Sequence, residues 1–261
     1  MTISNKQKAI SKRPFKIRLR KGDTVIVPIG TTEQHGPHLP YLTDMLIPLE
    51  VAKRAAKKMK ALVASPLPYG LSQAHYGFPG IIWLSGKTLI SVLEDVALSL
   101  AKTGFRRIIF VNGHYCNDQP LFVAITDVTA SPELPKGTNV YGITYWNVMS
   151  PKMAEKYLSW KVGWHANIGE TSAILAIDDK IVDMHRAPVE WPKVGEETAT
   201  LNISATQTGG RHLVSKTGIW GDARKASKKL GEQFLEYISN GLVRTIANYE
   251  KTYGKASAKT R

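Results

Sequence analysis

The chain has 261 residues, of which 43% are hydrophobic, and carries a formal charge of +14. This length and composition suffice for one large globular domain or two small ones, and no apolar run approaches the ~20 residues that a membrane span needs. Cys116 is the single cysteine, which excludes a disulfide within the chain. Since the N-terminus also lacks the apolar stretch of a secretory signal, the sequence predicts a cytoplasmic protein with no membrane partner.

The basic charge is concentrated at the two ends of the sequence. Residues 1–21 hold eight Lys or Arg and residues 251–261 hold four, with no acid in either segment, and the remaining 23 basic and 21 acidic residues nearly balance. We therefore predict a basic flexible N-terminal tail at 1–21, a single domain at 22–250 and a basic C-terminal tail at 251–261. Solvated tails are the favoured interpretation, and a nucleic-acid-associated protein that binds through them is the alternative.

The first predicted elements are a strand and the helix that follows it. The β-branched, apolar run 24–29 (TVIVPI) predicts a buried strand. A helical period extends from Met45 to Lys60, with Thr43 or Asp44 as the expected N-cap. Pro48 is expected in the first turn, where its missing N–H costs little.

Strands and helices continue to alternate along the chain. Residues 61–66 predict a second strand, residues 88–103 an amphipathic helix ended by Gly104, and residues 107–111 (RIIFV) a third, buried strand. The later expected elements are a helix from about Gln119, a strand near 139–145, a helix over about 169–178, and a long helix from Ala223 to Tyr249 with a weak point at Gly241.

Strand–helix alternation with uninterrupted apolar strands indicates an α/β fold. Such strands form a mostly parallel sheet that is covered by helices on both faces. Ligands of these sheets bind beyond the carboxyl ends of the strands. Residues 183–220, rich in Pro, Gly and Thr, show no clear period, and we interpret them as an irregular excursion that serves as a lid or an oligomer contact.

A cluster of potential metal ligands follows the first predicted strand. Glu33, His35 and His38 lie in a loop shaped by glycine and proline, and Asp44 opens the next helix. Each residue alone could equally be a cap or a loop hydrogen-bonding group. Together, carboxylates and imidazoles within twelve residues at a strand end favour the binding of one or two divalent metals.

Two further sites are weaker when taken alone. His114, in Asn112-Gly113-His114, follows the third strand, and a single histidine there is more often a loop residue than a ligand. His165 precedes Glu170-Thr171-Ser172 near the start of a predicted helix, where an acid in the first turn is common for electrostatic reasons.

The order of these motifs resembles the creatininase (creatinine amidohydrolase) family. The chain reads E-Q-H-G-x-H-L-P-x-x-T-D at 33–44, F-P-G at 78–80, V-N-G-H-x-x-N at 111–117 and H-A-x-x-x-E-T-S at 165–172. A G-x-x-G-D piece at 218–222 fits the C-terminal part of the family pattern. The first motif is specific by itself, and the others become specific through their order and spacing.

The resemblance implies a three-layer α/β/α sandwich, assembled as a homohexamer, that hydrolyses amide C–N bonds, often in cyclic amides. It also implies two divalent ions per subunit, zinc or manganese. Carried over residue by residue, the expected metal ligands are Glu33, His35, Asp44, His114 and Glu170. Asp44 would bridge the two ions.

One departure from the family pattern concerns Cys116. Creatininase itself has a metal-binding Glu two residues after the motif histidine, where this chain has Cys116. We expect Glu170 to take that role as the fifth ligand. A thiolate ligand is the second option for Cys116, and a partly buried thiol with no role at the metals is the favoured one.

The resemblance also implies residues for catalysis and substrate binding. His165 matches a histidine that moves protons, and its ordinary pKa near ~6.5 suits that role. Tyr115, Trp146 and His75 match positions near the substrate, although core packing is an equally favoured role for Trp146. Tyr115 and Trp146 favour a small, flat cyclic amide such as creatinine.

Other substrates and roles stay open. Within the same family the alternatives are a formamide hydrolase acting on a nucleotide-like intermediate, a peptidase acting on a modified peptide, and a hydrolase of a cyclic polyol ketone. A phosphate-bearing substrate would need extra cations near the site, and Arg186 and Arg211 are candidates. A non-catalytic member that lacks metal because Cys116 replaces an acid is a further possibility.

Overall fold

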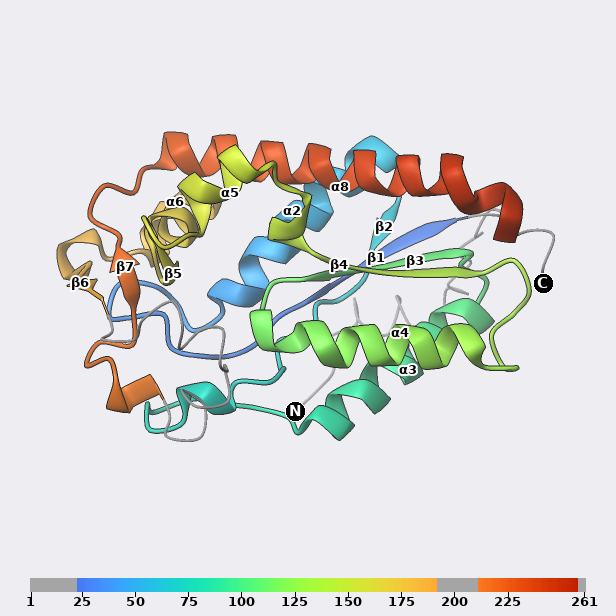
Figure 1. Cartoon of the computed structure of the whole chain (residues 1–261), viewed down its shortest axis with the longest axis horizontal. Coiled ribbons are helices and arrows are strands. Elements are labelled where there is room, and N and C mark those ends of the chain that lie inside the picture. The colour runs from blue at the N-terminus through green and yellow to red at the C-terminus, as the bar shows by residue number, and fades with distance from the viewer. Residues whose placement is uncertain (1–22, 192–210, 258–261) are drawn as a thin grey trace, which may run out of the picture.

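The computed structural model describes residues 23–191 and 211–257 (Figure 1). The predicted N-terminal tail, part of the irregular excursion and the last four residues lie outside the described residues. A central sheet of four parallel strands has the order β2-β1-β3-β4. Its strands are β1 (Thr24–Ile29), β2 (Leu62–Val63), β3 (Arg107–Asn112) and β4 (Asn139–Thr144).

Alternate residues of β1 and β3 face two separate hydrophobic cores. Ile26 and Ile109 belong to one core, whereas their neighbours Val27 and Ile108 belong to the other. All four side chains are buried. Because successive side chains of a strand point to opposite faces, a strand that is apolar at every position is buried on both sides.

Helices cover both faces of this sheet, as Figure 1 shows. One face carries α2 (Thr43–Met59), α6 (Ile168–Ile177) and the long α8 (Lys228–Ser257), and the other carries α3 (Gly86–Lys102) and α4 (Asp118–Ala130). The predicted α/β fold with a parallel sheet between helical layers is thus confirmed. None of the helices in the described ranges is long and apolar enough to cross a membrane.

A second, antiparallel sheet lies at one end of the molecule, on the left of Figure 1. Its strands, in the order β5-β7-β6, are β5 (Gly163–His165), β7 (Trp220–Asp222) and β6 (Val189–Glu190). The remaining elements are short: α5 (Pro151–Tyr157) and the 3-10 turns η1 (Gln73–His75), η2 (Tyr115–Asn117), η3 (Tyr145–Val148), η4 (Asp179–Ile181), η5 (Met184–Arg186) and η6 (Arg211–Leu213).

Helix α2 begins earlier than the sequence predicts. Leu42 is its N-cap, so the expected N-cap residues Thr43 and Asp44 lie inside the helix. The Thr43 hydroxyl donates to the Pro40 carbonyl at 2.7 Å, which ties the preceding loop to this first turn. Pro48 therefore lies in the helix interior rather than in its first turn.

Two other boundaries differ from the predictions. Strand β2 is continuous over Leu62–Val63 alone, and beyond Pro66 the run returns to β1 only through an isolated bridge between Leu67 and Ile29. Helix α8 continues to Ser257 through the start of the segment expected to be a tail, and Gly241 lies inside it. At Gly241 a Cβ atom would come within 2.9 Å of the Val148 carbonyl oxygen, so this glycine permits a close approach of η3 rather than a break.

The loops after β1 and β3 press against the N-terminus of α2. A Cβ atom at Gly30 would lie 2.3 Å from the Asp44 carbonyl oxygen, and one at Gly113 would lie 2.1 Å from the same atom. Only glycine allows this contact. It places the first turn of α2 at the carboxyl ends of the two central strands.

Candidate metal centre

The carboxyl ends of β1 and β3 hold a compact cluster of buried acids and imidazoles. None of its members is more than 6% exposed. The cluster comprises the five predicted ligands, Glu33, His35, Asp44, His114 and Glu170, together with His75 and His165. Burying so many ionisable groups is costly unless they are paired or bind metal.

Asp44 lies between two imidazoles. Its Oδ1 is 2.9 Å from Nε2 of His35, and its Oδ2 is 2.8 Å from Nδ1 of His114. Each carboxylate oxygen therefore faces a different histidine, which is the arrangement that a carboxylate bridging two ions requires.

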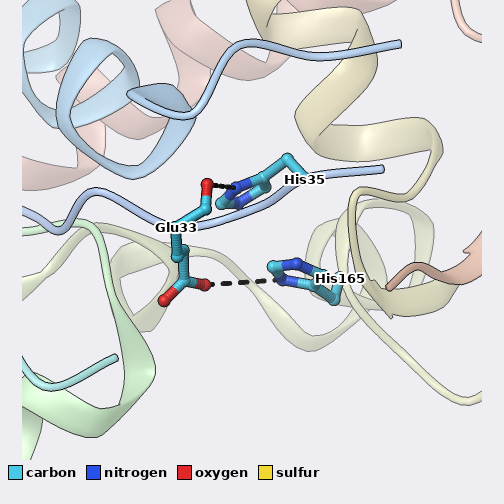
Figure 2. Close-up of side chains that lie close together, drawn as sticks. All are labelled: Glu33, His35 and His165. Carbon is cyan, nitrogen blue, oxygen red and sulfur yellow. Dashed lines mark hydrogen bonds and ion pairs between the residues drawn. The ribbon is translucent and has the colours of Figure 1, made fainter. Parts of the chain in front are cut away.

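Glu33 contacts histidines from three segments. Its Oε1 lies 3.2 Å from Nε2 of His75 and 3.8 Å from Nδ1 of His165, and Figure 2 shows the latter contact. Its Oε2 is buried and has no hydrogen-bond partner, although Nδ1 of His114 is 3.4 Å away. A buried carboxylate oxygen without a donor is the kind of orphaned atom that a cation satisfies.

The ligand atoms form three groups in which all atoms lie within 4.8 Å of one another. Two of these groups share Asp44: one adds Glu33 and His114, and the other adds His35 and Glu170. The third group combines Glu33, His35 and His165. Mixed carboxylate and imidazole sets suit zinc and manganese, so the residues fit the metals expected from the sequence.

Three histidines are each oriented by a main-chain carbonyl. Nδ1 of His35 lies 3.3 Å from the Glu33 carbonyl oxygen, as drawn in Figure 2, and Nε2 of His114 lies 2.8 Å from that of Leu71. Nε2 of His165 lies 2.8 Å from the Gln34 carbonyl oxygen. A ring N–H that donates to a carbonyl leaves the other nitrogen free to bind, which is the usual support of metal-bound histidines.

Without a metal ion, burial and the charges of neighbouring groups shift the pKa values of these side chains. Although burial opposes the charge, Asp44 raises the pKa of His35 to about 9. Against the same burial effect, Glu33 raises the pKa of His114 well above its ordinary value. His35 in turn holds the pKa of Asp44 below its usual range despite burial. Burial raises the pKa of both Glu33 and Glu170 to about 7.

His165 does not keep the ordinary pKa that the sequence suggested. Burial, and then the proximity of His35, holds its pKa well below the usual value. The His165 ring lies 4.3 Å from the His35 ring and 4.6 Å from the His75 ring, measured between centroids. A neutral His165 whose Nε2–H donates to the Gln34 carbonyl directs the Nδ1 lone pair towards Glu33.

Gln34 joins several parts of the cluster, although sequence reasoning gave it no role. Its Nε2 donates to Nδ1 of His75 at 2.9 Å and to the Gly218 carbonyl at 2.9 Å. His75 is thereby left with an Nε2–H that faces Glu33, so in the structure it orients this carboxylate. Its expected contact with substrate stays a prediction. The signal was available, since Gln34 stands inside the motif between two expected ligands.

Glu170 reaches the cluster from the start of α6. The Asn167 side chain caps this helix by accepting from the Glu170 N–H at 3.0 Å. The Ala166 N–H donates to Oε2 of Glu170 at 2.6 Å, and Ala166 has the left-handed φ of 51°. This turn fixes the carboxylate in place, and the backbone strain at Ala166 is typical of functional sites.

Other residues singled out in the sequence lie at the margin of the cluster. His38 is buried, but its Nε2 faces Thr171 Oγ1 at 2.9 Å, and it belongs to none of the three groups. Cys116 interacts electrostatically with His114 and belongs to none of these groups, so the thiol with no role at the metals stays a prediction. Tyr115 is 54% exposed beside His114.

Trp146 packs against the core of the α2 face. It is half-buried, and its ring meets the Tyr145 ring edge-on with centroids 4.9 Å apart. The Tyr145 hydroxyl in turn hydrogen-bonds that of Tyr157 at 2.8 Å. Trp146 therefore has the core-packing role that the sequence analysis left open, and its contact with substrate stays a prediction.

Fold and site together define an α/β/α protein with a cluster of candidate metal ligands at the carboxyl ends of its parallel strands. The family model described as "Creatininase: Creatinine amidohydrolase" matches residues 9–246. The chain belongs to this family and is therefore a creatininase-family hydrolase, as the sequence motifs predicted.

Individual relatives agree with this assignment. The chain is 31% identical to creatinine amidohydrolase of Pseudomonas putida, covering 90% of this chain and 93% of the relative. It is 30% identical to the mycofactocin precursor peptide peptidase of Mycolicibacterium smegmatis, covering 87% and 85%. Two solved structures, a manganese creatininase and a creatininase mutant of the Zn-Zn type, each match with a TM-score of 0.72 at 27% identity, covering 87% of this chain and 91% and 90% of theirs.

Proposed function

We propose that this protein is an amidohydrolase that binds two divalent ions, zinc or manganese, and cleaves an amide C–N bond. The observation that carries the proposal is the position of Asp44, which belongs to two ligand groups at once. His35 and Glu170 would complete one ion's site, and Glu33 and His114 the other. When bound, such ions activate water for attack and polarise the amide carbonyl.

The residues of the chain would prepare the site in two ways. The carbonyl contacts of His35 and His114 fix which nitrogen faces the ligand groups, and the contact between His75 and Glu33 holds that carboxylate in place. Burial also excludes bulk water, which strengthens every electrostatic interaction inside the cluster.

We assign proton transfer to His165. Its Nδ1 faces Glu33, and its Nε2 is held by the Gln34 carbonyl. A neutral imidazole there would accept a proton from the attacking water and deliver it to the amide nitrogen, which leaves only when it is protonated. Because His165 also belongs to a ligand group with Glu33 and His35, metal content has to be measured together with turnover.

The substrate is proposed as a small cyclic amide, with creatinine as the first compound to test. Similarity to the Pseudomonas putida enzyme supports this choice. A peptide bond is the second candidate, supported by the nearly equal identity to the peptide peptidase. A homo-oligomer, a hexamer by family resemblance, and a cytoplasmic location stay predictions.

The test is turnover by protein that has been freed of metal and then reloaded. We expect elemental analysis to give two ions per chain after loading with manganese or zinc. Hydrolysis of a panel of cyclic amides and short peptides should depend on that loading. A protein that takes up no metal, or turns over every amide equally well without it, would contradict the proposal.

A further inference from the structure

Arg211, which the sequence offered only as a candidate cation for a phosphate-bearing substrate, lies within electrostatic reach of the ligand cluster. It lies in η6, within residues 183–220, which we interpreted from the sequence as an irregular excursion. Burial lowers its pKa, and the strongest opposing influence is the negative charge of Glu33. Its Nε atom is buried and has no hydrogen-bond partner.

The position of Arg211 is fixed by its neighbour. Nδ1 of His212 lies 2.5 Å from the Tyr76 carbonyl oxygen, and the His212 ring packs edge-on against Tyr76 with centroids 5.7 Å apart. A Cβ atom at Gly77 would fall 2.1 Å from the His212 ring, so the two segments touch. Tyr76 directly follows His75, which contacts Glu33, and η6 is thereby anchored against the cluster.

The guanidinium is close to the acids of the cluster but is paired with none of them. No ion pair within 4.0 Å joins Arg211 to an acid of the described segments. By contrast Arg54, at the surface, forms two such pairs, with Glu50 and Glu232. Within the described segments, at least the Nε–H donor of Arg211 has no partner in the protein and is available to a ligand.

The net charge of the cluster with two metal ions bound indicates which kind of ligand Arg211 would favour. Three carboxylates would offset three of the four positive charges of two divalent ions, so the centre would carry one positive charge until a hydroxide forms from the bound water. Arg211 would add another positive charge at its edge. A further cation is unfavourable there unless the ligand that enters the site brings negative charge with it.

We propose that Arg211 selects substrates that carry an anionic oxygen group, a carboxylate or a phosphate, close to the amide that is cleaved. This inference rests on the proposed hydrolase function and narrows its substrate class. The planar guanidinium binds such groups through paired hydrogen bonds, which a lysine cannot reproduce. Creatinine lacks such a group, so the proposal favours acidic cyclic amides or peptides that end in a free carboxylate.

The carboxylate arm of the test uses two probes of the same shape and different charge, 5-oxoproline and its carboxamide. Binding of each to the manganese-loaded protein is measured by calorimetry, which does not require turnover. We expect the wild-type protein to prefer the carboxylate ~10- to 100-fold, the range that charge-assisted hydrogen bonds provide. Arg211→Met should remove most of this preference, and Arg211→Lys should retain part of it.

The phosphate arm uses inorganic phosphate as the probe. Binding of phosphate that is lost in Arg211→Met assigns a phosphate-bearing substrate, and an Arg211-dependent preference for 5-oxoproline assigns a carboxylate. Either result supports the proposal. If neither anion binds more weakly to Arg211→Met than to the wild-type protein, Arg211 does not read substrate charge and the proposal is wrong.

Two controls distinguish a failure of this inference from a failure of the proposed hydrolase function. Arg186→Met removes an exposed cation from η5 and should leave the probe preference unchanged. Elemental analysis of every variant reports metal content independently of probe binding. Two ions per chain without an Arg211-dependent preference would refute only this inference, whereas absence of metal uptake would refute the proposed function. If Arg211→Met does not fold, Arg211→Lys keeps the positive charge and still tests whether the paired hydrogen bonds of the planar guanidinium are needed.

Discussion

Pro48 lies four residues after Asp44 in helix α2 and has no N–H to donate to the Asp44 carbonyl oxygen. The same oxygen is the atom that a Cβ added at Gly30 or at Gly113 would meet first. The first turn of α2 is thus free of one helical hydrogen bond where two loops of the sheet meet it. The residue that gives up this bond carries the carboxylate at the centre of the cluster.

Gly113→Ala tests this contact. The added Cβ would lie 2.1 Å from the Asp44 carbonyl oxygen and 2.6 Å from Cγ of Pro48, so backbone must move. We expect a loss of about 1–3 kcal/mol in the free energy of unfolding, measured by urea denaturation. Gly86→Ala is the matched control, because a Cβ there meets nothing within 4 Å. Equal unfolding midpoints for the two variants would contradict the close approach.

Asp44→Asn tests the bridging carboxylate. The amide keeps the shape of the side chain but offers one poor ligand atom and no charge, so both ligand groups lose their shared member. We expect metal content to fall from two ions per chain to below one, measured by elemental analysis. Asp179→Asn, a change at an exposed acid that pairs with Lys228, should retain both ions. Retained stoichiometry in Asp44→Asn would refute the bridging role.

His165→Ala tests proton transfer. We expect kcat to fall by about 10²- to 10⁴-fold, the usual contribution of a general acid–base group, while two ions remain bound. Metal content and turnover should be measured on the same preparation. If one ion is lost together with activity, His165 acts as a ligand in the group that contains Glu33 and His35.

Metal binding should release protons, and more of them at lower pH. At about pH 8 the pKa of about 9 leaves the His35 imidazole protonated without metal, so binding displaces about one proton from it, and the raised pKa of His114 acts in the same direction. Near pH 6, below the pKa of about 7 of Glu33 and Glu170, these carboxylates also carry protons that a metal must displace. Apparent metal affinity therefore falls as pH decreases. Calorimetry in buffers of different ionisation enthalpy measures the number of protons released on metal binding. Heats of binding that do not depend on the buffer would contradict this release.

The two central strands could be predicted from the sequence because each is a six-residue, mostly apolar run. The run 24–29 was predicted as a strand and is β1, and 107–111 became β3 with Asn112 added. Four of the five expected ligands, Glu33, His35, Asp44 and His114, lie together because parallel strands place the segments that follow them at one edge of the sheet. Motif order supplied Glu170, which no local pattern would have joined to Glu33.

The second sheet, and the position of Arg211 beside the cluster, could not be predicted in this way, although Arg211 was named as a candidate cation. Strands β5 and β7 are three residues each and lie far apart in the chain, too short for a period to appear. Arg211 stands in a segment without periodicity, and its sequence neighbours say nothing about Glu33. Its place is decided by the contact between His212 and Tyr76, a long-range pairing that leaves no local signal.

The ligand set opens at Glu33 and closes at Glu170, so more than half of the chain has to be synthesised before its last member exists. During translation an emerging polypeptide would present Glu33, His35 and Asp44 with no opposing carboxylate from α6. The group of His35, Asp44 and Glu170 cannot be complete at that stage, whereas the group of Glu33, Asp44 and His114 does not need α6. Loading of the first group should therefore follow the docking of α6, so the two ions would enter the protein at different stages of its maturation.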